Sequence, residues 1–309
     1  MIDIKEMTCE PYGSCISMRN QTIQLIITVE KGPRIIYLGF CGEENVLFED
    51  KKQEYYFFNP EISQILGQTA RHYLYGGHRF YLSPSHLPQA RYPDNDAVVY
   101  TVEPDGVLFQ APVQKTSGLA LSYKIMLGET GADVMMIHTA QNNADDTRHA
   151  ALCTSTMMRP GGFAVLPQNR GNEFFVPDRM YVYWPFSRLH DSRFHAEEAF
   201  MTVQHDSTLR YPFKIGYNNT QGWLAYANGN TVLTKRYVHD PKAVYPDNGA
   251  SGQVYCCKDF LELTVQSPMY RIAPQDTVKH VENFSLFRTK TTQKPTANAE
   301  YQTFLEALV

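Results

Sequence analysis

Two stretches of the chain bring together side chains that can bind hydroxyl groups and move protons. Residues 75–81 read Tyr-Gly-Gly-His-Arg-Phe-Tyr, and residues 235–240 read Lys-Arg-Tyr-Val-His-Asp. Each is followed by the turn sequence Tyr-Pro-Asp-Asn, at 92–95 and at 245–248. Aromatic rings can pack against the C–H faces of a sugar, and charged groups can hydrogen-bond its hydroxyls. This combination predicts a carbohydrate site.

The first stretch places a proton-transfer group beside a hydroxyl-binding group. Gly76 and Gly77 let the backbone turn sharply or approach a ligand closely. His78 can exchange a proton near neutral pH, and Arg79 presents a fork of donors. A Gly-Gly hairpin with exposed polar residues is the alternative. The neighbouring rings, Tyr75 among them, favour a binding role because they supply stacking surface.

A carboxylate follows on a strand-like segment, residues 260–266. Leu261, Leu263 and Val265 share one face, and Glu262 lies on the other. If the aliphatic face packs on the core, Glu262 points toward solvent or a cleft. A carboxylate on a rigid strand can act as a general base, and an ordinary exposed glutamate is the alternative.

The second stretch supplies further binding candidates. Lys235 and His239 share one face of the predicted strand 231–239, and either face of this strand can point inward. Lys235 either binds a ligand or forms a surface ion pair. Asp247 is a candidate for binding hydroxyls, although Pro-Asp-Asn is also a good turn sequence. Trp184 is either a stacking ring or a core residue.

A period of two dominates the hydrophobic pattern. In residues 22–30, Ile23, Leu25, Ile27 and Val29 share one face, which marks a half-buried strand. Many short strands separated by turn residues indicate a large antiparallel sandwich. Further strands are predicted at 33–40, 45–49, 97–103, 107–111, 119–127, 133–140, 148–158, 180–184, 222–227, 231–239, 260–266 and 278–287. On the last of these, His280 and Glu282 predict a buried pair that supports the site from behind.

Helix is predicted at two places. Residues 59–68 fit a short helix or turn, and residues 297–309 fit a terminal helix because their apolar residues share a helical face. We expect residues 1–288 to form one all-β domain, and residues 289–309 to form a C-terminal connector with a short helix.

Composition excludes several classes of protein. The 309 residues carry a formal net charge of -4 with a pI near 6.2, which argues against nucleic acid as a partner. Apolar runs are too short to span a membrane, and no signal peptide is visible. Six cysteines match no zinc spacing. We expect a cytoplasmic protein with no metal, no cofactor and no membrane partner.

Several motifs together resemble a known family. Gly76-Gly77-His78-Arg79, the Met-Arg-Pro-Gly-Gly sequence at 158–162, Trp184-Pro185-Phe186, and the segments 245–249 and 260–263 look like bacterial relatives of galactose mutarotase, or aldose 1-epimerase. The match runs over nearly the whole chain, to about residue 287. It implies an all-β supersandwich with few short helices and a carbohydrate-binding cleft on one sheet. It also implies an isomerase that interconverts sugar anomers without a cofactor, using a histidine as general acid and a glutamate as base.

The resemblance also implies individual roles. Glu262 is similar to the family's base, and Arg79 resembles its sugar-binding arginine. The mid-chain strand that carries the general acid in the family reads here as 151–158 and contains no histidine. We therefore hypothesise that His78 takes this role. A non-catalytic sugar-binding or sensing protein, and a lyase or hydrolase acting on an acidic sugar, are the alternatives. The expected partner is a small-molecule carbohydrate, with a homodimer as an option.

Overall fold

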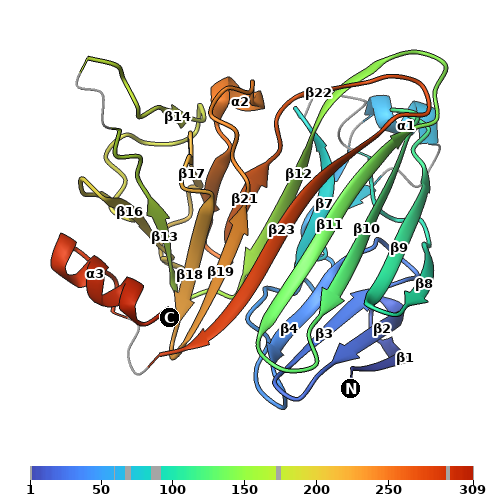
Figure 1. Ribbon diagram of the computed structural model, residues 1–309, viewed down its shortest axis with the longest axis horizontal. Coiled ribbons are helices and arrows are strands. Elements are labelled where there is room, and N and C mark those ends of the chain that lie inside the picture. Colours follow the sequence, from blue (N-terminus) through green and yellow to red (C-terminus); the bar gives the residue numbers. More distant parts are fainter. Residues whose placement is uncertain are drawn as a thin grey trace.

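Two large antiparallel sheets face each other across an apolar core (Figure 1). The computed structural model describes residues 2–58, 60–66, 71–84, 92–171, 175–289 and 293–308. The 11-stranded sheet contains, in spatial order, β1 (Asp3–Cys9), β2 (Gly13–Arg19), β3 (Ile23–Thr28), β4 (Ile35–Phe40), β7 (His78–Ser83), β12 (Arg148–Met158), β21 (Leu261–Gln266), β20 (Gly252–Cys256), β17 (Phe213–Tyr217) and β14 (Tyr181–Tyr183), with β22 (Tyr270–Ile272) paired to β12.

The second sheet has ten strands. In spatial order they are β15 (Phe194–Ala196), β16 (Phe200–Gln204), β13 (Phe163–Pro167), β18 (Trp223–Asn228), β19 (Thr231–Tyr237), β23 (Thr277–Arg288), β11 (Asp133–Asn142), β10 (Leu119–Leu127), β9 (Gly106–Val113) and β8 (Val99–Glu103). A separate pair, β5 (Tyr56–Phe58) and β6 (Arg71–Tyr73), forms a small third sheet. The predicted all-β supersandwich is confirmed.

Helix is scarce in the part of the chain that the structure describes. It comprises α1 (Pro60–Leu66), the short α2 (Pro246–Gly249) and α3 (Asn298–Glu306). α1 falls within the predicted range 59–68, of which residues 59, 67 and 68 lie outside the described residues. α3 packs Tyr301 and Phe304 against Phe200 and Phe163, so it covers the outer face of the second sheet beside β13 and β16 (Figure 1).

Hydrophobic alternation explains which strands the sequence reveals. The predicted ranges 119–127 and 148–158 coincide with β10 and β12, and β10 alternates between buried and half-buried residues along its whole length. β16 was not predicted, because α3 and the core bury both of its faces and remove the alternation. Residues 45–49 do not form the expected strand. They make only two isolated bridges, Leu47 to Met158 and Glu49 to Gly76.

A buried ion pair crosses the core between the sheets. The Nζ atom of Lys235, on β19, lies 3.4 Å from Oε2 of Glu282, on β23. Lys235 also donates to the hydroxyls of Thr154, at 2.9 Å, and Thr156, at 3.1 Å, on β12 of the opposite sheet. Thr154 in turn donates to Glu282. All four side chains are fully buried, and the hydroxyls give each desolvated charge at least one hydrogen bond, although Oε2 of Glu282 contacts Lys235 only as an ion pair.

Three histidines extend this polar column. Nδ1 of His78 lies 2.9 Å from the Thr156 hydroxyl, and Nε2 of His78 lies 3.3 Å from Nε2 of His138, on β11. Nε2 of His280 lies 3.2 Å from Oε1 of Glu282, as the predicted buried pair requires. Burial and the nearby Lys235 hold the pKa of His78 well below its usual range, and burial lowers the pKa of His138 to about 4. Burial disfavours the charged imidazole, so the rings of His78 and His138 are neutral.

We predict that removing one partner of the ion pair destabilises the fold strongly. Lys235→Met leaves the Glu282 carboxylate buried without its counter-charge, and the expected loss is about 3–5 kcal/mol in the free energy of unfolding. The double variant Lys235→Met, Glu282→Leu removes both charges and should recover part of this loss. Urea unfolding at pH 7 measures both variants. Equal destabilisation of the single and the double variant would contradict the prediction.

We also predict that stability falls as the pH falls from about 6.5 to about 4. In the unfolded chain the His138 imidazole binds a proton near pH 6.5, whereas in the folded protein it binds a proton only near pH 4. Acid in this window therefore favours unfolding, by about 3 kcal/mol in total for that residue. Urea unfolding at several pH values should show that the free energy of unfolding of His138→Phe depends less steeply on pH than that of the parent protein. His149→Gln, an exposed control, should keep the slope of the parent protein. An unchanged slope in His138→Phe would rule out this origin.

Candidate functional site

Side chains that alternate with the core residues form a cleft on the outer face of the 11-stranded sheet. On β7 and β21, His78 and Leu261 point into the core, whereas Arg79 and Glu262 point outward. The cleft has a volume of about 510 Å³. Its polar lining is Ser155, Arg79, His72, Lys214, Glu262, Tyr81 and Tyr255, and its other lining residues are Phe57, Phe58, Ile62, Leu74, Met157, Trp184, Phe186, Pro212 and Phe260.

Arg79 is fixed from two sides. Its Nε atom donates to Oδ2 of Asp94 at 2.8 Å, and the same carboxylate oxygen accepts from Arg34 at 3.1 Å. Arg34 is fully buried and also donates to the backbone oxygen of Leu74, at 2.7 Å. Asp94 therefore joins the cleft arginine to a buried second arginine. This arrangement holds one guanidinium in a single orientation at the cleft wall.

His72 completes the environment of Arg79. Nη1 of Arg79 contacts Nε2 of His72, and a guanidinium can only donate. Nε2 of His72 must therefore accept, which leaves that nitrogen unprotonated. His72 consequently orients Arg79 and cannot donate a proton to a ligand from this atom.

Glu262 lies half-buried at the floor of the cleft. Its Oε1 atom accepts a hydrogen bond from the Thr264 hydroxyl at 3.0 Å, two residues along β21. Two tyrosines, Tyr81 and Tyr255, lie nearby. Burial, together with neighbouring groups that include Glu262, raises the pKa of both tyrosines above their usual value. Their hydroxyls are therefore poor proton donors in this cleft, and the carboxylate is its basic group.

Lys214 and Trp184 form the opposite wall. The Nζ atom of Lys214, on β17, lies 4.1 Å from the centre of the Trp184 ring, which is a cation–π contact. The ring packs over Gly216, where a Cβ atom would come within 3.2 Å of it. The same Cβ atom would come within 2.7 Å of the Ala250 Cβ atom, so the close packing at this position requires a glycine.

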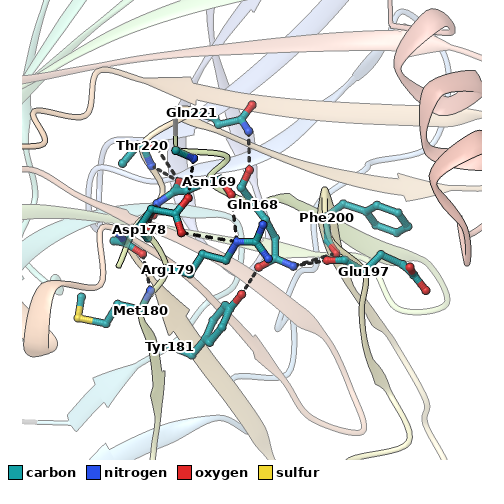
Figure 2. Close-up of polar contacts among 12 residues, drawn as sticks. Gln168, Asn169, Asp178, Arg179, Met180, Tyr181, Glu197, Phe200, Thr220 and Gln221 are labelled. Atoms are coloured by element: carbon teal, nitrogen blue, oxygen red, sulfur yellow. Dashed lines mark hydrogen bonds and ion pairs between the residues drawn. The ribbon is translucent and has the colours of Figure 1, made fainter. Parts of the chain in front are cut away.

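Polar contacts hold the segment that leads into β14 and Trp184 (Figure 2). Asn169 donates to the backbone oxygen of Asp178 at 2.7 Å, and Nε of Arg179 donates to the backbone oxygen of Asn169 at 3.1 Å. Tyr181 donates to the side-chain oxygen of Gln168. The segment is thereby tied to the end of β13, and this fixes where β14 delivers the indole ring.

Three of the side chains predicted from the sequence come together in the cleft: Glu262, Arg79 and Trp184. His78 and Lys235 do not join them, because strand alternation turns both into the core between the sheets. Tyr75 is also buried away from the cleft. Its hydroxyl donates to Oδ1 of Asn95 at 2.8 Å.

The two remaining candidates lie elsewhere. His239 stacks on Tyr245, with ring centroids 4.6 Å apart, and lines a separate open groove of about 790 Å³. Asp247 sits above the outer face of the sheet, where Oδ2 accepts from Gln253 at 2.7 Å and from Gln266 at 3.0 Å. Its positive φ of 51° is a strained conformation for a residue other than glycine.

Sequence reasoning missed His72, Lys214 and Asp94 as parts of the site. Residues 213–217 carry a signal for Lys214, because Phe213, Ile215 and Tyr217 alternate with it and pack in the core. No comparable signal marks His72, which comes from the short strand β6. Among the described residues, no group of three or more His, Cys, Asp or Glu side chains is arranged to hold a metal ion. Within the same residues, no helix is long and apolar enough to cross a membrane.

Comparison with solved structures identifies the fold. A TPR-domain containing protein from Parabacteroides distasonis is 12% identical with a TM-score of 0.62; the match covers 92% of this chain and 49% of that one, so this chain spans about half its length. A galactose mutarotase-like protein from Lactobacillus casei is 11% identical with a TM-score of 0.58, over 88% and 99% of the two chains. A candidate aldose 1-epimerase from Klebsiella pneumoniae is 9% identical with a TM-score of 0.57, and the match covers 98% of this chain and 87% of that one.

These matches establish the fold alone, since the identities are low. The resemblance to galactose mutarotase-like proteins inferred from the sequence is confirmed at this level. No protein-family model and no curated protein matches the chain.

We predict that Asp94→Asn lowers stability and loosens the cleft arginine. The substitution removes the negative charge shared by Arg34 and Arg79, and the expected loss is about 3 kcal/mol in the free energy of unfolding. Asp96→Asn, a neighbouring exposed carboxylate, serves as the control and should change stability by less than about 0.5 kcal/mol. Urea unfolding measures both. Equal effects of the two substitutions would show that Asp94 does not have this bridging role.

Proposed function

We propose that the protein binds a sugar in the cleft and interconverts its anomers. The observation that carries this proposal is the convergence of Glu262, Arg79 and Lys214 with aromatic rings in one cleft. A sugar needs flat apolar surface for its C–H faces and charged or polar groups for its hydroxyls, and this lining supplies both. The galactose mutarotase-like fold of the chain agrees with this proposal.

The reaction requires one base and one acid. Glu262 takes the proton of the anomeric hydroxyl, the bond between the anomeric carbon and the ring oxygen breaks, and the ring oxygen receives a proton. The open aldehyde turns about its bond to the next carbon. Reclosure by the reverse proton transfers gives the other anomer, so atoms and charges balance without a cofactor. Each positioned proton-transfer group contributes about 10²–10⁴-fold to such a reaction.

We assign the proton donor to Lys214 in place of His78. His78 is fully buried between the sheets, so a sugar in the cleft does not reach it. His72 accepts from Arg79 at the nitrogen that faces it, and the raised pKa values of Tyr81 and Tyr255 make their hydroxyls weak acids. The Lys214 ammonium is the other cation of the described lining, and unlike the guanidinium of Arg79 it can release a proton. Arg79 then binds hydroxyls and stabilises negative charge on oxygen.

We predict that Glu262→Gln slows anomer exchange by about 10²–10⁴-fold, because an amide cannot take up the proton of the anomeric hydroxyl. Exchange spectroscopy by NMR, with a panel of aldoses, measures the rate in both directions. Glu198→Gln, an exposed glutamate outside the cleft, is the matched control and should exchange anomers at the parental rate. A fully active Glu262→Gln variant would falsify the assignment of the base. Saturable binding without exchange would identify a sugar-binding protein.

A further inference from the structure

The cleft changes character between its floor and its mouth. At the floor, Arg79 is 8% exposed and Ser155 3% exposed, and both are polar. At the mouth, Phe57, Phe58 and Phe186 are 52%, 59% and 43% exposed. Large apolar side chains gathered at one exposed place mark a binding surface, since their exposure to water is unfavourable. The mouth therefore suits an apolar surface of a ligand, whereas the floor suits polar groups.

Two of the three rings at the mouth, Phe57 and Phe186, are supported by other rings. Phe57, on β5, contacts the His72 ring with centroids 6.2 Å apart, and Phe186, after β14, contacts Tyr255 at 6.3 Å. Tyr255 in turn packs on Phe260, with centroids 5.9 Å apart. Because these contacts hold the aromatic side chains in place, a ligand that stacks on them loses little of its affinity to ordering them.

The cleft is larger than one sugar ring needs. A hexose has about 12 non-hydrogen atoms, and even at the liquid volume of water, about 30 Å³ per such atom, it takes about 360 Å³. The cleft measures about 510 Å³. The cleft therefore has room for more than one sugar ring, and the exposed part of its lining consists of the aromatic rings at the mouth.

We propose that the cleft takes the reducing end of a disaccharide or longer oligosaccharide, with the second ring held between the aromatic side chains at the mouth. This inference rests on the proposed function. If Glu262 acts on the anomeric hydroxyl, the anomeric carbon lies at the floor, and the rest of the sugar points to the mouth. A second ring attached at the opposite end of the first then stacks its C–H faces between Phe58 and Phe186.

The test compares monosaccharides with reducing disaccharides. Dissociation constants for glucose, galactose, maltose, cellobiose and lactose are measured by NMR titration, which requires no turnover. At least one disaccharide should bind about tenfold more tightly than its reducing-end monosaccharide. Phe58→Ala and Phe186→Ala should each reduce this preference by about two- to tenfold, because each weakens disaccharide binding more than monosaccharide binding. Leu189→Ala, an exposed apolar residue near Phe186 that does not line the cleft, is the control and should keep the preference.

The possible results separate the inference from the function on which it rests. Equal affinity for monosaccharides and disaccharides, with monosaccharides bound and interconverted, overturns the second subsite only. Binding of no sugar rejects the proposed function and the subsite with it. A change in oligomeric state on Phe58→Ala, measured by sedimentation, with the disaccharide preference unchanged, overturns the subsite and assigns the aromatic mouth to an interface between two copies of the chain.

Discussion

The buried ion pair between Lys235 and Glu282 is the constraint on which the cleft depends. Two charges taken out of water destabilise a fold unless polar partners offset the lost hydration. Here Lys235 donates to the hydroxyls of Thr154 and Thr156 on the opposite sheet, and Thr154 also donates to Glu282. These hydroxyls are available only in one register of β12. A slip by one residue would turn both outward and bring Ser155, a lining residue of the cleft, into the core. The register that satisfies the buried charges is therefore the register that displays the site.

The same alternation explains how much of the site could be predicted from the sequence. The period of two correctly places Glu262 on the face opposite Leu261 and Leu263, and it predicts most of the strands. It also requires adjacent residues to face opposite ways, so His78 and Arg79 cannot both reach one ligand from a regular strand. The sequence does not reveal which face meets the other sheet, because this depends on strands far away in the chain.

The repeated Tyr-Pro-Asp-Asn sequence shows that local sequence does not fix a local role. In the first copy, Asp94 bridges Arg34 and Arg79 and so orients a cleft side chain. In the second copy, Asp247 adopts a left-handed conformation and accepts from the buried side-chain amides of Gln253 and Gln266. The two carboxylates differ because their partners come from different strands. The partners of Asp94 are an arginine just before β4 and an arginine on β7, whereas the partners of Asp247 are outward-facing amides on β20 and β21. Turn chemistry accounts for the similarity, and tertiary contacts account for the difference.

The charge balance of the cleft links its architecture to the chemistry proposed for it. The described lining carries the cations of Arg79 and Lys214 against the single carboxylate of Glu262. The charge of Asp94 is shared with Arg34, so it neutralises Arg79 only in part. In the proposed reaction, ring opening moves an electron pair onto the ring oxygen, and the positive charges of Arg79 and Lys214 stabilise that oxygen until Lys214 transfers its proton to it. A ligand covering the aromatic mouth excludes water and strengthens this effect, since charges interact more strongly in a medium of lower polarity. In this proposal the polar floor and the apolar mouth act together, because the covered mouth creates the environment in which the charges at the floor are most effective.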